Sequence, residues 1–231
     1  MQKNSATKKY AVYIMLIGLA IVALEWKIDT GVSYGFVMGE NEGVSMYVIT
    51  QFVTSYVGGH LSIDIFFNPL GYLLIAAGFI CLGKSSISTR GIVMSVIGII
   101  ANLVEMFIPM MLDVEDLCVP VIVLHLLQVV AVISVMYALT GICTKKIDNY
   151  KYMQVGKDLR FGAELYGICL IIGKILYLFT RADWYFSHIL YVVVTIAGLC
   201  AVLYYIVKMC IYLGQVEMFA DREEIEENER K

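Results

Sequence analysis

Two neighbouring apolar stretches decide the fold of this chain: GIVMSVIGIIANLVEMFIPMML at residues 91–112 and VPVIVLHLLQVVAVISVMYALTGIC at residues 119–143. Each is long enough to cross the apolar core of a bilayer, which is about 30 Å thick and needs about 20 residues of helix. Only a short acidic segment around Glu115 separates them. Because consecutive elements usually lie side by side, the two stretches predict an antiparallel hairpin of membrane-length helices.

Four further apolar stretches flank this hairpin. Together with it they predict six spans, at residues 10–26, 65–83, 91–112, 119–143, 161–180 and 184–213. The composition agrees, since 60% of the 231 residues are apolar and 16% are charged, against about 45–50% and 25% in soluble domains. We therefore expect an all-α fold: a polytopic integral membrane protein with one six-helix transmembrane domain over residues 1–213.

The charged residues alternate in sign from one connection to the next. Lys and Arg mark the cytoplasmic side of a membrane protein, and they gather in the N-terminal tail, at 84–90, at 145–160 and in the C-terminal tail. The opposite connections are acidic, as at 113–116. This pattern predicts six crossings with both termini in the cytoplasm, and the many Ile, Lys and Tyr residues favour a bacterial plasma membrane.

Two segments fall outside the predicted spans. The outer loop at 27–64 contains VSMYVITQFVTSYVG at 44–58, which we interpret as an interfacial helix or a re-entrant piece. The alternative is an ordered loop packed over the bundle. The tail at 214–231 is acidic and polar, and is expected to be a solvated extension of the last span or a docking site for a partner protein.

A few polar side chains interrupt the hairpin at matching positions. Glu105 and His125 are equally distant from Glu115, and so are Asn102 and Gln128. Antiparallel packing therefore brings Glu105 level with His125, and Asn102 level with Gln128. Because each pair within one stretch is spaced i,i+3, each pair also shares one face of its helix.

Further ionisable residues are expected in the same outer half of the membrane. Lys174 and His188 are equally distant from the turn near Arg181, and Asp64 precedes the second span. Such groups cost about 2.5–3.5 kcal/mol inside a span and usually face the bundle interior. We therefore expect an outward-facing polar cavity. The candidates for binding a substrate or proton are Glu105, His125, Lys174, His188, Asp64, Asn102 and Gln128.

Two other interpretations of these polar residues stay open. They can act as interhelical hydrogen bonds, with an ion pair between Glu105 and Lys174, that fix the packing. A metal site is the less favoured alternative, because the histidines are scattered. Its nitrogen and oxygen ligands would be His60, Asp64, Glu105, His125 and His188. The sequence contains no HExxH, no phosphate-binding glycine loop and no GxSxG, so no cofactor is expected.

These features favour a transport component for a small solute, an ion or protons. One alternative is a membrane-embedded enzyme, such as a metal-dependent hydrolase acting from the outer leaflet. Another is a non-catalytic accessory, immunity or sensor protein. The expected partners are the lipid bilayer, a small solute or ion, and a protein bound through the tail. The net charge of −3 with dispersed basic residues argues against nucleic acid.

Overall fold

The structure is a computed structural model, and it describes the chain in segments. Side-chain burial is described for 10–24, 68–83, 85–107, 119–143, 154–177 and 189–214. The backbone is described for 2–24, 27–28, 32–40, 47–56, 63–64, 68–83, 85–111, 118–144, 150–179 and 185–229.

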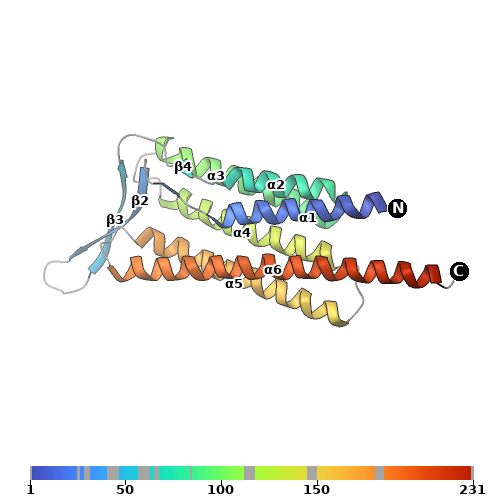
Figure 1. Cartoon of the computed structure of the whole chain (residues 1–231). Coiled ribbons are helices and arrows are strands. Elements are labelled where there is room, and N and C mark those ends of the chain that lie inside the picture. Colours follow the sequence, from blue (N-terminus) through green and yellow to red (C-terminus); the bar gives the residue numbers. More distant parts are fainter. Residues whose placement is uncertain are drawn as a thin grey trace.

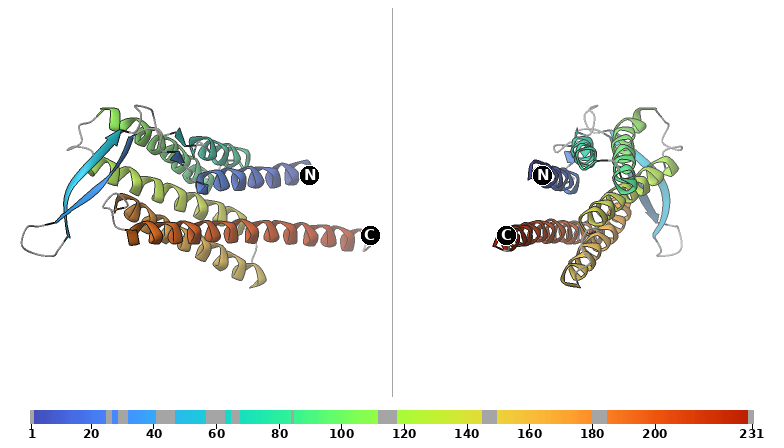
Figure 2. Two further views of the ribbon diagram at one scale, coloured as in Figure 1. Left: turned by 60° about the vertical axis from the view of Figure 1, so that its left-hand side comes forward. Right: turned by 90° about the vertical axis from the view of Figure 1, so that its right-hand side faces the viewer.

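Six helices form the described part of the bundle (Figure 1). They are α1 (Gln2–Ala23), α2 (Asn68–Cys81), α3 (Ser86–Met111), α4 (Cys118–Thr144), α5 (Tyr150–Phe179) and α6 (Tyr185–Glu229). Each helix packs against the next in the chain, and α1 also contacts α6. The two termini lie at the same end of the bundle, which is also seen in the side view of Figure 2.

Three of these helices are long and apolar enough to cross a membrane. Within the described residues the qualifying segments are Ser86–Phe107, Val119–Cys143 and Ile189–Gly214, and Tyr10–Ala23 and Asn68–Cys81 are shorter apolar helices. Large apolar side chains such as Val93, Leu126 and Leu203 are exposed on the surface. A helix that is apolar on all sides is typical of a membrane span, so the prediction of a helical membrane protein is confirmed at this level.

The segment at 44–58 differs from our expectation. Strand β2 (Val32–Glu40) pairs in antiparallel fashion with β3 (Tyr47–Tyr56), with one irregularity between Val37 and Met38. The prediction of an interfacial helix is therefore wrong for residues 47–56. The physical reason is the run of β-branched and aromatic residues, which suits a pleated ribbon better than a helix.

The strands lie at the end of the bundle away from the termini (Figure 1). A second short pair, β1 (Lys27–Ile28) with β4 (Ile63–Asp64), joins the two ends of the outer segment. Strand β2 also contacts α5. This arrangement agrees with the alternative of an ordered segment packed over the bundle.

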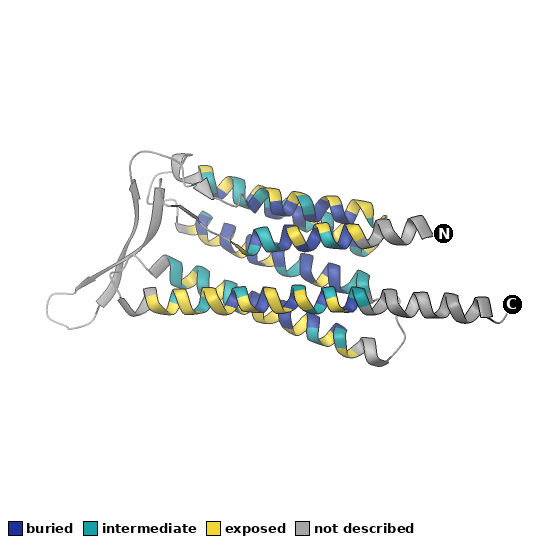
Figure 3. Ribbon diagram, viewed as in Figure 1, coloured by how far each residue is buried: buried dark blue, intermediate teal, exposed yellow. Residues whose placement is uncertain are grey.

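Among the described residues, the buried ones lie on the helix faces that are turned toward one another, and the exposed ones lie on the outer faces (Figure 3). One continuous apolar core includes Met15 from α1, Ile75 from α2, Met136 from α4 and Tyr205 from α6. The Tyr205 hydroxyl donates to the Met136 carbonyl and pairs with Thr140, each at 2.9 Å. These hydrogen bonds link α6 to α4 within the apolar core.

Glycines allow a close contact between α1 and α2. A Cβ added at Gly18 would lie 2.5 Å from the carbonyl oxygen of Gly71, and one added at Gly71 would lie 2.7 Å from that of Gly18. Since real Cβ contacts are longer, only glycine permits this approach. The contact sets the position of the first turn of α2, which begins with Asn68.

We expect Gly18→Ala and Gly71→Ala each to lower the unfolding temperature of the purified protein in detergent. The added methyl group overlaps a backbone oxygen that cannot rotate away, and overpacking of this kind costs about 1–3 kcal/mol. Gly141→Ala is the control, because its nearest atom would lie 3.7 Å from the new Cβ. Equal melting of all three variants would contradict the close contact.

Candidate functional site

The α3–α4 hairpin brings an acid and an imidazole together inside the bundle. Glu105 on α3 and His125 on α4 are 7% and 4% exposed. The distance between Glu105 Oε1 and His125 Nε2 is 3.1 Å, within hydrogen-bonding range. The predicted juxtaposition of these two residues is confirmed. It follows from their equal distance from the turn, because antiparallel helices with the same rise per residue stay in register.

Gln128 completes this cluster from the next turn of α4. Its Nε2 donates to Glu105 Oε2, the carboxylate oxygen that does not face His125. The sequence predicts Asn102 at the level of Gln128, but the Asn102 amide donates to the carbonyl of Gly98 in its own helix, at 2.8 Å. A carboxylate is a stronger acceptor than a neutral amide, which explains why the long Gln128 side chain turns to Glu105.

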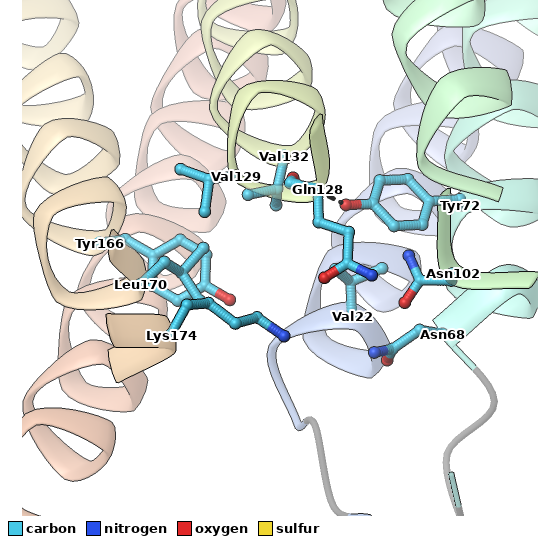
Figure 4. Close-up of a pocket in the computed structure, with 10 residues that line it drawn as sticks. All are labelled: Val22, Asn68, Tyr72, Asn102, Gln128, Val129, Val132, Tyr166, Leu170 and Lys174. Carbon is cyan, nitrogen blue, oxygen red and sulfur yellow. Dashed lines mark hydrogen bonds between the residues drawn. The ribbon is translucent and has the colours of Figure 1, made fainter. Parts of the chain in front are cut away.

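A small cavity of about 20 Å³ lies beside this cluster. Such a volume admits about one water molecule. Figure 4 shows the side chain of Lys174 reaching from α5 toward Gln128 and Asn68. The lining residues come from α1 to α5: Val22, Asn68, Tyr72, Asn102, Gln128, Val129, Val132, Tyr166, Leu170 and Lys174.

Tyr72 forms one wall of the cavity and is held from two sides. Its ring lies against α3 so closely that a Cβ added at Gly98 would be 2.5 Å from a ring carbon. Its hydroxyl is 3.5 Å from the carbonyl oxygen of Gln128, the contact drawn in Figure 4. Glycine at residue 98 thus allows a tyrosine of α2 to reach α4 across α3.

A second cavity of about 80 Å³ lies between α4 and α5. Its lining residues are Ile122, His125, Leu126, Val129, Ile171, Lys174 and Ile175. All of these are apolar except His125 and Lys174. Val129 and Lys174 line both cavities, so the polar and the apolar space adjoin at these two side chains.

The remaining candidates fall outside the described side chains. Asp64 lies in β4, opposite Lys27 in register, and His188 lies in α6, but only their backbones are described; His60 is not described at all. Among the described residues, no three His, Cys, Asp or Glu side chains gather as a metal site would require. Of the five ligands of the alternative metal site, only Glu105 and His125 have described side chains, and the structure brings these two together.

The sequence-based candidates did not include Asn68, Tyr72 and Tyr166, which also line the polar cavity. A periodicity signal exists for each. Tyr72 is one turn after Asn68, and Tyr166 is two turns before Lys174, so each shares a helix face with a polar residue. Tyrosine is common in apolar spans, so a tyrosine alone does not indicate a site residue.

Comparison of the chain with models of protein families, with curated proteins and with solved structures finds no match. The chemistry of the site is therefore argued from its geometry. A buried carboxylate needs partners that offset its lost hydration. Glu105 has two of them, and one is a side chain that can itself gain a proton. The pair can consequently exist in two protonation states that differ by one charge.

We expect Glu105→Ala to destabilise the protein, because it leaves the buried polar atoms of His125 and Gln128 without their acceptor. An unsatisfied buried group costs about 1–3 kcal/mol, which a lowered unfolding temperature in detergent will register. Glu164→Ala is the matched control, since Glu164 is exposed and accepts a hydrogen bond from Tyr137 at 2.5 Å. If both variants unfold at the same temperature, the cluster does not contribute to the stability of the protein.

Proposed function

We propose that this chain is a membrane transport component in which the buried Glu105–His125 pair takes up and releases a proton as a small solute or ion moves. One observation carries the proposal: two ionisable side chains, both more than nine-tenths buried, lie 3.1 Å apart on neighbouring apolar helices. Ionisable groups in such surroundings are functional candidates by default.

The type of side chain favours proton exchange over a purely structural role. Two amides can fix the packing of neighbouring helices without placing a charge in an apolar environment. An acid and an imidazole are costlier to bury, and what they add is a change of protonation state. The neighbouring cavity has space for a water molecule, which can pass a proton to the pair.

We propose further that all six helices cross a bacterial plasma membrane, with both termini in the cytoplasm. The common end of the two termini supports this arrangement, and so does the distribution of Lys and Arg. The polar cluster then lies in the outer half of the membrane. The apolar packing around Tyr205 closes the inner half, so the pair exchanges protons with the outer side.

The extension of α6 past the last span belongs to the same proposal. Helix α6 continues to Glu229, well past the apolar segment that ends at Gly214, and the sequence from residue 215 is acidic. A helix of this length on the cytoplasmic side offers an acidic surface to a partner protein.

Glu105→Gln is expected to abolish proton exchange and leave the fold intact, because an amide keeps the shape of the carboxyl group and loses its titration. Infrared difference spectra of the purified protein between acidic and alkaline buffer should show a protonated carboxylic acid band. The component of this band that arises from a buried carboxyl group should be absent in Glu105→Gln and present in Glu164→Gln, because the exposed carboxyl groups contribute to the band in every variant.

Proton flux is measured on the same variants. In vesicles with an imposed potassium diffusion potential, an internal pH-sensitive dye should report proton movement for the unmodified protein and not for Glu105→Gln. A Glu105→Gln protein that keeps both the infrared band and the flux would contradict the proposal. The accessory role is favoured if Glu105→Gln is fully stable and neither the unmodified protein nor any variant shows the infrared band or the proton flux.

Cysteine labelling tests the proposed orientation. In a background without other cysteines, Glu115→Cys should react with an impermeant maleimide on intact cells. Lys231→Cys should react only after the cells are opened, because we place it in the cytoplasm. Labelling of Lys231→Cys on intact cells would overturn the topology.

A further inference from the structure

The polar cavity and the apolar cavity adjoin, and together they suit an amphiphilic ligand. The polar cavity and the apolar cavity share Val129 and Lys174 as a common wall. A molecule that occupies both would have a small polar group at one end and a hydrocarbon chain at the other. The shared wall lies between α4 and α5, at the level of the Glu105–His125 pair.

The polar cavity selects the head group by size and by hydrogen bonding. Its volume of about 20 Å³ is close to that needed for one water, which is too small for a phosphodiester with its glycerol. Figure 4 shows Lys174, Gln128 and Asn102 directed at the same space. The Lys174 ammonium has three donor hydrogens, and the Gln128 and Asn102 amides each keep one beyond the hydrogen given to Glu105 and to Gly98. This lining matches the charge of a carboxylate, which is the smaller of the two anionic groups.

The apolar cavity opens toward the membrane-facing surface. Leu126 on α4 and Ile175 on α5 are 54% and 50% exposed, and both line it. Ile122 and Ile171 line it as well and are also exposed. A hydrocarbon chain can therefore lie in this groove and continue into the surrounding lipid without leaving an apolar environment.

We propose that this site binds a single-chain carboxylate of the fatty-acid type, which enters sideways from the outer leaflet between α4 and α5. The carboxylate lies in the polar cavity beside Lys174, and the chain lies in the groove lined by Leu126 and Ile175. The inference rests on the proposed function in one respect, which is that the bound carboxylate is taken to be the transported solute. Binding itself needs no proton transfer.

The test uses the full-length protein in bilayer discs of uncharged phosphatidylcholine, with stearate that carries a spin label near its chain end as the probe. The immobilised fraction of the probe measures binding. Oleate should displace it, and oleyl alcohol, which has the same chain and no charge, should compete about tenfold less well. Phosphatidylglycerol, an anion on a diacyl lipid, should not compete.

Variants separate the two halves of the site. Lys174→Met should weaken oleate binding about tenfold and leave competition by oleyl alcohol unchanged. Leu126→Trp fills the groove from its exposed rim and should weaken both ligands. Lys208→Met is the matched control, because Lys208 is a helix lysine outside both cavities that pairs with Asp158 at 3.3 Å. It should bind as the unmodified protein does.

Three outcomes would overturn the inference: unchanged oleate binding in Lys174→Met, unchanged binding in Leu126→Trp, or equal competition by phosphatidylglycerol. If Lys174→Met does not fold, Leu126→Trp and the competition by phosphatidylglycerol still decide. Oleate binding is measured on the unmodified protein and needs neither the proton flux nor the infrared band. Failure of binding and failure of the proposed function are therefore distinguishable.

Discussion

The burial of one carboxylate constrains the half of this bundle that lies away from the termini. Glu105 lies among apolar helices and cannot stay ionised there without strong partners. His125 and Gln128 supply them from the facing helix, and this fixes the register of α3 against α4. The surrounding polar side chains, from Asn68 to Lys174, then line the only kind of space that tolerates them, which is the interior between helices.

Small residues make this interior accessible to side chains from distant parts of the sequence. The contact of Gly18 with Gly71 brings α1 against the start of α2. Gly98 lets Tyr72 cross α3 and reach α4. The hydroxyl of Tyr205 ties α6 to α4 through the Met136 carbonyl, within the apolar core.

Much of this arrangement is predictable from the sequence, and the reasons are local. Apolar length predicts the helices, and equal distances from one turn predict the pairing of Glu105 with His125. The partner of Gln128 is not predictable in this way, because its choice between Asn102 and Glu105 depends on acceptor strength at one contact. The strand at 47–56 differs from the prediction of a membrane-surface helix. Its apolar residues include β-branched ones, and these favour a strand. The roles of Asp64, His60 and His188 stay predictions.

The shortness of α2 has a consequence for the surrounding lipid. This helix has 14 residues, which at 1.5 Å each span about 21 Å, whereas a bilayer core is about 30 Å thick. A helix that is too short draws the bilayer inward or tilts its neighbours. In the proposed topology, the bilayer beside α2 is therefore thinned, and the head groups on the outer side come closer to Asn68. Hydrophobic mismatch at one helix would thus shorten the path from the aqueous phase to the buried acid.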